Sequence, residues 1–200
     1  MQNILELSSR FNWIDILIFI VFLRLIFISL KQGLAIEFFK LLGVFSGLYL
    51  ALHYYFSLAL YLNGRSGNKN SPGLFLEFSS YLALIALGYL VFWLLRVLIF
   101  RFITAEINPF LSRWGGGILG FLRALLLSGL ILFAILIPKS TYFRESVRYS
   151  LSGRYFVQVA PATYTWIWES IVSKFNSKEK FNSAILDVYS AELKQKKKNK

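Results

Sequence analysis

The amino-acid sequence contains four long stretches made almost entirely of apolar residues. They cover residues 12–30, 34–62, 75–100 and 115–137. About 20 mainly apolar residues in a helix cross a hydrocarbon layer about 30 Å thick, and a helix satisfies its own backbone hydrogen bonds there. The pattern therefore predicts an all-α polytopic membrane protein with about four transmembrane helices.

The composition favours the same class of protein. Of the 200 residues, 56% are hydrophobic and only 16% are charged, whereas soluble domains average roughly 25% charged residues. Aromatic residues reach 18%, which suits lipid-facing surfaces and interfacial belts. The sequence has no cysteine, so disulfides, thiolate metal sites and a cysteine nucleophile are excluded.

The connections between the stretches predict how the helices alternate. Residues 31–33 are too few to recross the membrane, so the first two helices must form an antiparallel hairpin. Residues 63–73 are rich in Gly, Asn, Ser and Pro, which is typical of an exposed loop on the opposite side. Pro138 ends the fourth helix, because proline cannot continue it without losing a hydrogen bond. We therefore assign residues 1–138 to a four-helix transmembrane domain with both ends on one side.

After the last predicted span the chain becomes too polar to cross a membrane. Residues 139–176 form an aromatic, partly amphipathic segment, and we expect an amphipathic helix in the membrane interface. Residues 177–200 place apolar residues at helical spacing and end in a run of lysines. This part is predicted to be a basic surface helix or a disordered tail.

The formal net charge of +12 bears on partners and orientation. The chain lacks a recognisable nucleic-acid-binding module, so we interpret the excess charge as an anchor to the bilayer, with anionic lipid as a candidate partner. Lysine and arginine are nearly balanced between the two sides. When the long C-terminal region is left out, the bias places the turn at residues 31–33 in the cytoplasm.

Small residues four apart line one face of each of two helices. Helices in a bilayer associate where small residues let their backbones approach. The second helix carries Gly43, Gly47 and Ala51, and the fourth carries Gly116, Gly120, Ala124 and Ser128. We expect these two ladders to pack, either on each other or across a homo-oligomer. The alternative is a chance placement of common small residues.

Charged residues inside the predicted spans gather toward the end that contains the turn at residues 31–33. Such residues are costly in lipid, so they are expected to face a bundle interior and to find partners. The cluster comprises Arg24, Glu37, Lys40, Arg96 and Arg123. Its net charge is positive, and an anion or a lipid phosphate would complete it. The alternative is that each cation reaches the headgroups on its own, which we favour for Lys40 and Arg96 but not for the deeper residues.

Other polar residues in the spans give weaker indications. His53 has no second histidine with which to form a metal site, so we interpret it as an interfacial polar residue. Asp15 lies in the first turn of the first helix, where its charge favours the positive end of the helix dipole. No catalytic residue, cofactor or metal is predicted.

Three short elements go beyond general membrane-protein features. WID opens the first helix, KQGLAIE forms the hairpin turn, and RWGGGILGFLR begins the last helix. In order and spacing they are similar to elements of the colicin V production (CvpA) family. The matching positions are Trp13, Asp15, Gly33, Glu37, Arg113, Gly116, Gly120 and Arg123.

The resemblance runs from about residue 12 to residue 172, and residues 173–200 look like an individual extension. Ser112 stands where many family members have an acidic residue, and Ala124 replaces a common glycine. The family consists of bacterial inner-membrane proteins linked to colicin V production or export, and some members are connected with envelope homeostasis. The resemblance implies the same location and role for this chain.

We therefore expect a non-enzymatic, multi-pass inner-membrane protein that acts as a homo-oligomer or with other membrane proteins. The alternative is an oligomeric channel or small transporter for an anionic solute, using Arg24, Glu37 and Arg123. An intramembrane enzyme is disfavoured, because the spans lack paired aspartates, a Ser–His pair and a metal-ligand pattern.

Overall fold

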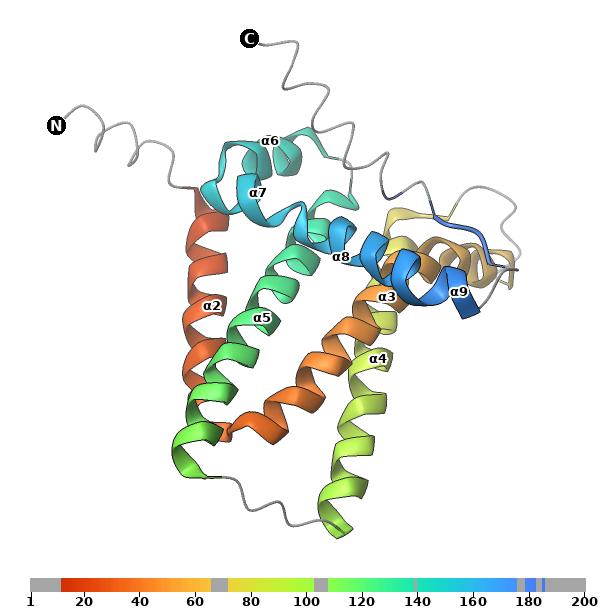
Figure 1. Cartoon of the computed structure of the whole chain (residues 1–200). Helices are drawn as coiled ribbons and strands as arrows, with labels where there is room; N and C mark the ends of the chain where they lie inside the picture. The colour runs from red at the N-terminus through yellow and green to blue at the C-terminus, as the bar shows by residue number, and fades with distance from the viewer. Residues whose placement is uncertain are drawn as a thin grey trace, which may run out of the picture. The chain divides into compact units, whose positions relative to one another are not determined.

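The computed structural model describes residues 12–65, 72–102, 108–138, 140–175, 179–182 and 185. Throughout these residues the regular secondary structure is helical, and four helices are long and apolar enough to cross a membrane. They are α2 (Trp13–Gln32), α3 (Leu34–Arg65), α4 (Leu74–Phe102) and α5 (Pro109–Leu136) (Figure 1). The prediction of an all-α polytopic protein with four such helices is confirmed.

The largest difference from the predicted boundaries is the start of α5, which begins at Pro109 rather than near residue 115. Proline suits the first position of a helix, because its φ angle is already helical and no N–H is needed there. Asn108 precedes it, and its side-chain oxygen accepts a hydrogen bond from the Phe110 N–H at 3.0 Å. The uninterrupted apolar stretch begins later than the helix because Ser112 and Arg113 lie in its first two turns.

The chain divides into two compact units. One comprises residues 21–127, and the other comprises residues 1–20 together with residues 128–200. The long helices α2 and α5 each contribute to both units, because the division falls inside them.

In the unit of residues 21–127, α3 and α4 form a closely packed antiparallel pair. The backbones approach so closely at Gly47 and Gly88 that a Cβ atom on Gly88 would collide with the Gly47 backbone. Farther along, the rings of Tyr55 and Tyr81 lie 6.2 Å apart in an edge-to-face arrangement. The buried residues of α3 recur every three or four positions, which is the spacing that keeps one face of a helix on its neighbour. They are Glu37, Leu41, Gly43, Val44, Gly47, Leu48, Ala51, Leu52, Tyr55, Ala59 and Asn63.

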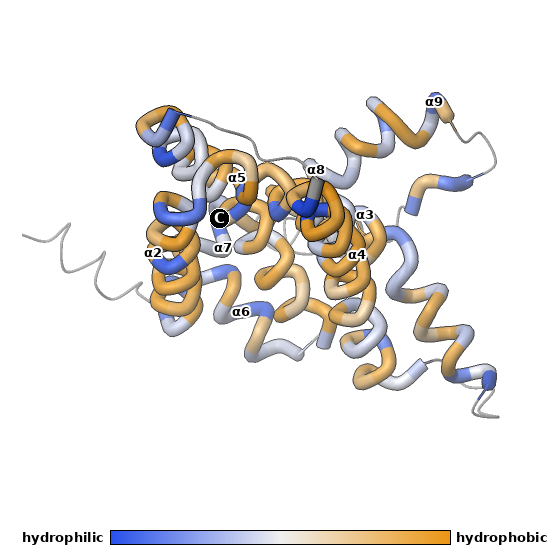
Figure 2. Tube along the Cα trace, turned by 90° about the horizontal axis from the view of Figure 1, so that it is seen from below, coloured by the Kyte–Doolittle hydropathy of each residue, from blue (hydrophilic) through white to orange (hydrophobic). Residues whose placement is uncertain are grey.

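The remaining faces of α4 are apolar and exposed. Large side chains such as Leu87, Leu90, Leu94 and Leu98 are each about half exposed. Figure 2 shows hydrophobic residues along most of the four long helices and a larger share of hydrophilic residues on α6. An exposed apolar helix surface of this length suits contact with lipid chains rather than with water.

The unit of residues 1–20 and 128–200 contains short helices that follow α5. They are α6 (Thr141–Tyr149), α7 (Leu151–Phe156), α8 (Val159–Ile167), a π-helical turn η1 (Trp168–Val172) and α9 (Ser173–Phe175). α8 lies close to α5, because a Cβ atom on Gly129 would be 2.9 Å from the Ala160 backbone nitrogen. Trp166, Ile171 and Phe175 remain exposed, as expected of a segment in the membrane interface. Its location there stays a prediction.

A short piece of the C-terminal region packs on α8. The hydroxyl oxygen of the buried Tyr164 accepts a hydrogen bond from the Asn182 N–H at 3.2 Å, and the Phe181 ring lies 5.3 Å from the Tyr164 ring. Burial raises the pKa of the Tyr164 hydroxyl above its ordinary value, against the lowering effect of the Asn182 hydrogen bond. Apart from residues 179–182 and 185, the predicted surface helix or tail at 177–200 lies outside the described residues.

Candidate functional site

The candidate site lies where the turn between α2 and α3 meets the start of α5. Gly33 is the turn residue, with a φ angle of 81° that side chains rarely permit. The Ser112 hydroxyl of α5 lies so close to Gly33 that a Cβ atom there would collide with it, and it accepts a hydrogen bond from the Leu34 N–H at 3.4 Å. A residue of α5 therefore helps to cap the first turn of α3.

Two glycines of α5 bring this helix against α2. A Cβ atom on Gly116 would lie 2.8 Å from the Ser29 carbonyl oxygen, and one on Gly120 would overlap the Ser29 side chain. The rings of Phe22 and Phe121 meet 5.7 Å apart in the same unit. The close approach leaves the Ser29 side chain fully buried beside the α5 backbone.

A buried ion pair lies next to this contact. The Arg123 Nη1 atom of α5 is 3.1 Å from the Glu37 Oε2 atom of α3. The side chain of Glu37 is fully buried, and that of Arg123 is only 5% exposed. The Arg123 Nη2 atom also donates to the Ser29 hydroxyl at 3.3 Å, and that hydroxyl donates to the Leu25 carbonyl at 2.7 Å. These contacts join side chains of α2, α3 and α5.

A second cation extends the pair toward the surface. Lys40, one turn after Glu37, places its Nζ atom 3.1 Å from Glu37 Oε1 and also donates to the Gln32 side-chain oxygen. Glu37 thus interacts with two cations, and the three side chains carry a net charge of +1. The Arg123 Nε atom has no hydrogen-bond partner within the described part of the chain.

The cluster of Ser29, Glu37, Lys40 and Arg123, together with the glycine contacts beside it, holds α2, α3 and α5 together, and we call it the joint. Charges in a low-dielectric interior are tolerated when they are paired and hydrogen-bonded, and removing one partner of a buried pair costs about 3–5 kcal/mol. Among the described residues, no group of three or more His, Cys, Asp or Glu side chains is placed to hold a metal ion. The site can hold helices together and can attract an anion at its cationic edge.

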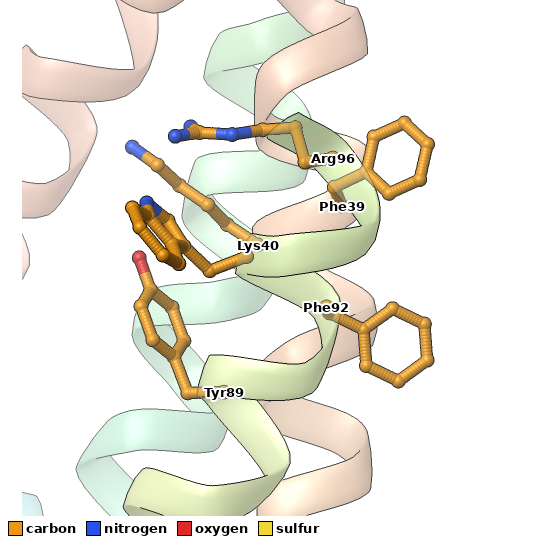
Figure 3. A pocket seen from close by; sticks show the side chains of 6 residues that line it. Phe39, Lys40, Tyr89, Phe92 and Arg96 are labelled. Atoms are coloured by element: carbon orange, nitrogen blue, oxygen red, sulfur yellow. The ribbon is translucent and has the colours of Figure 1, made fainter. Parts of the chain in front are cut away.

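The structure brings together some of the predicted cluster and not the rest. Glu37 and Arg123 form the ion pair, with Lys40 bound to the same carboxylate. Arg96 of α4 lines a small pocket beside Lys40 (Figure 3). Arg24 lies exposed on α2, so its expected pairing with the deeper charges is not seen.

Sequence reasoning missed the uncharged members of the cluster, Ser29, Gln32 and Ser112. Ser29 lies one turn before Gly33, and Ser112 stands at the position that is often acidic in the resembling family. A hydroxyl at the end of an apolar helix is a weak indication by itself, because serine commonly bonds to its own helix backbone, as Ser29 does.

The two small-residue ladders pack on different helices from the ones expected. Gly43 and Gly47 of α3 face Tyr89 and Ile85 of α4, whereas Gly116 and Gly120 face α2. The expectation that the ladders pack on each other within the chain is therefore wrong for these glycines. The reason is that α4 supplies its own small residue, Gly88, opposite Gly47.

The three other ladder residues, Ala51, Ala124 and Ser128, are fully buried. Their burial is compatible with a packing role inside the chain. Contact across a homo-oligomer stays a prediction.

The Asp15 carboxylate accepts hydrogen bonds at the starts of two helices, α2 and α7, and not only at the start of its own helix. Its carboxylate accepts from the Asn12 N–H at 3.2 Å, at the start of its own helix. It also accepts from the Leu151 and Ser152 N–H groups of α7 at 3.2 and 2.6 Å. Asp15 is only 4% exposed, and it fastens the short helices after α5 to the beginning of α2.

The remaining predicted positions lie on the surface or among aromatic residues. Trp13 and Arg113 are exposed, so neither joins the buried cluster. His53 stacks on Tyr49 with ring centroids 5.3 Å apart and meets the edge of Tyr54 at 4.4 Å. These positions fit an interfacial or lipid-facing role.

Four long apolar helices, three of which meet at a buried ion pair and its hydrogen bonds, define a multi-pass α-helical membrane protein. The family model described as colicin V production protein matches residues 14–161. Because this match covers well over half of the chain, the protein belongs to the colicin V production family, and the predicted resemblance is confirmed. Comparisons with curated proteins and with solved structures gave no match.

Proposed function

We propose that this chain is a non-enzymatic inner-membrane protein that supports colicin V production or export, or envelope homeostasis, as a structural partner of other membrane proteins. The observation that carries the proposal is the use of the family-motif residues. Gly33, Glu37, Gly116, Gly120 and Arg123 all lie at the joint of α2, α3 and α5. Their contacts position helices, and none of them forms a catalytic arrangement.

The burial of the ion pair supports a holding role over a chemical one. A general acid or base must reach a substrate, and a nucleophile needs a base beside it. Glu37 is fully buried and already engaged by Lys40 and Arg123. Family membership gives the link with colicin V production.

A complementation experiment tests the proposal. A colicin V-producing strain that lacks its own family member would express this chain, and the killing zone on a sensitive lawn and growth in bile salt would be measured. Arg123→Gln should lose complementation, because it breaks the joint. Arg24→Gln is the matched control, since it removes an exposed arginine from a span and should complement fully. Full complementation by Arg123→Gln with normal folding would contradict the proposal.

The oligomeric anion channel or transporter remains as the alternative proposal. Net positive charge near Lys40 and Arg96 favours it, whereas the burial of Arg123 in an ion pair disfavours a path through that residue. Liposomes containing the purified chain would be tested for release of chloride and of phosphate. Release that Arg123→Gln abolishes in a folded protein would establish the alternative.

A further inference from the structure

The pocket between α3 and α4 has a composition that the joint does not explain. It is lined by Phe39, Lys40, Tyr89, Phe92, Trp93 and Arg96. Two cations, a phenol hydroxyl and an indole thus surround one small depression between the two helices. Figure 3 shows the charged ends of Lys40 and Arg96 on the same side as the Tyr89 hydroxyl, with the Phe39 and Phe92 rings on the other side.

The charge around this pocket is unbalanced. Glu37 is the anion beside Lys40, and Arg123 already occupies its second oxygen. Arg96 makes no ion pair with any acidic residue in the described parts of the chain. A half-buried arginine in an apolar surface requires an anion or water at its guanidinium, because leaving the charge unpaired in lipid is costly.

Lys40 and Arg96 lie close enough to the ends of their helices for their side chains to reach lipid headgroups. Lys40 lies six residues after the start of α3 and Arg96 six residues before the end of α4, so each Cα atom is about 9 Å from the end of its helix. Lysine and arginine side chains extend toward the interface from such depths. Because the helices are antiparallel, both cations reach the same leaflet.

The surroundings of the pocket indicate a ligand with an apolar part. Leu94, Leu95, Val97 and Leu98, next to Arg96 in α4, are all exposed. Trp93 and Tyr89 are 45% and 37% exposed, and such rings prefer the region between headgroups and acyl chains. A free anion would leave this apolar surface unused, whereas a phospholipid would cover it.

We propose that the pocket is a binding site for the headgroup of an anionic phospholipid. Its phosphate lies between the Lys40 ammonium and the Arg96 guanidinium and accepts a hydrogen bond from the Tyr89 hydroxyl. The acyl chains run along the exposed leucines of α4. The site shares Lys40 with the joint of α2, α3 and α5, but the residues that the test changes, Arg96 and Tyr89, are not among those that form the joint.

The test measures lipid binding to the full chain in detergent by native mass spectrometry. The probes are palmitoyl-oleoyl phosphatidylglycerol and palmitoyl-oleoyl phosphatidylcholine, which share their acyl chains. The chain should bind phosphatidylglycerol about tenfold more tightly. Arg96→Gln should weaken that binding about fivefold, as one basic residue near an anionic surface contributes about that factor, and Arg96→Lys should restore most of it.

Arg101→Gln is the matched control, because it removes an exposed arginine of α4 outside the pocket. It should change the affinity less than twofold, by the reasoning that screened surface charges contribute little. Equal effects of Arg96→Gln and Arg101→Gln, or equal binding of the two lipids, would overturn the proposal. Displacement of phosphatidylglycerol by millimolar inorganic phosphate would also overturn it, in favour of a free-phosphate site.

Tyr89→Phe is a second test variant, which keeps the proposal testable if Arg96→Gln fails to fold. Tyr89 is partly exposed, so loss of its hydroxyl leaves packing intact and should weaken phosphatidylglycerol binding about tenfold, as a hydrogen bond to a charged group predicts. Thermal unfolding of each variant is followed by circular dichroism. An unchanged affinity in folded Tyr89→Phe, together with an unchanged affinity in folded Arg96→Gln, would refute the site.

Discussion

The charges of the buried cluster predict that replacing Glu37 destabilises the protein more than replacing Arg123. Glu37 is the shared anion of two cations at 3.1 Å, whereas Arg123 is one of two cations on that anion. Glu37→Gln raises the net charge of the three side chains from +1 to +2 and leaves two cations facing each other. Arg123→Met lowers it to zero and leaves Glu37 paired with Lys40.

The expected magnitudes follow from this charge balance. Glu37→Gln should lower the free energy of unfolding by about 3–5 kcal/mol, the cost of an unpaired buried charge. Arg123→Met should cost about 1–3 kcal/mol, because Lys40 still compensates the carboxylate and only hydrogen bonds and packing are lost. The double variant should cost less than the sum of the two single costs, since the same interaction is removed in each.

The assay is reversible unfolding of the full chain in mixed micelles, followed by circular dichroism as denaturing detergent increases. Arg24→Met is the control, since its exposed side chain predicts a change within about 0.5 kcal/mol. A larger cost for Arg123→Met than for Glu37→Gln would refute the reasoning. Costs below about 1 kcal/mol for both variants would do the same, because they are incompatible with a desolvated pair.

Three further outcomes are expected. Gly120→Val should destabilise the chain by about 1–3 kcal/mol through overpacking against α2. Gly64→Val is the control, because position 64 faces open space and a side chain there meets no clash. Equal melting temperatures of the two variants would contradict this prediction. Asp15→Ala should speed hydrogen exchange of the first α7 amides about tenfold, as loss of a cap worth about 1–2 kcal/mol implies, and unchanged exchange would refute the fastening role. Because burial raises the pKa of Tyr164, its stabilising contribution is present below the ordinary tyrosine pKa and is lost as pH rises through the raised value. Proteolysis of the C-terminal region should therefore increase at high pH. The increase should be smaller in Tyr164→Phe, which has no hydroxyl to ionise.

The helices could be predicted from the sequence because apolar length alone decides what can cross a bilayer. The choice of neighbours could not be predicted in the same way. Ladders at Gly47 and Gly120 show that a helix has a face for close approach, but the partner depends on where small residues occur on other helices. Gly88 is a single glycine in α4, and nothing about its spacing distinguished it.

The charge cluster was partly predictable for a similar reason. Distance from the turn at residues 31–33 gives similar depths for Arg24 and Glu37, and counting from the start of the last helix places Arg123 in the same half of the membrane, which was enough to predict a cluster. The angular position of a residue around its helix also decides whether it faces inward, and Arg24 faces outward. Asp15 was assigned to its own helix end, because hydrogen bonds to α7, more than 130 residues away, leave no local trace in the sequence.

The position of Lys40 one turn after Glu37 has a consequence for biosynthesis. Glu37 enters the membrane with the α2–α3 hairpin, whereas Arg123 is synthesised roughly 90 residues later, which takes on the order of 4–20 s at usual elongation rates. During that interval the carboxylate would be an isolated charge among lipids. Lys40 is already present on the same helix, one turn away, and pairs with Glu37 at 3.1 Å in the complete structure, so we expect it to act as the counter-ion until α5 is made.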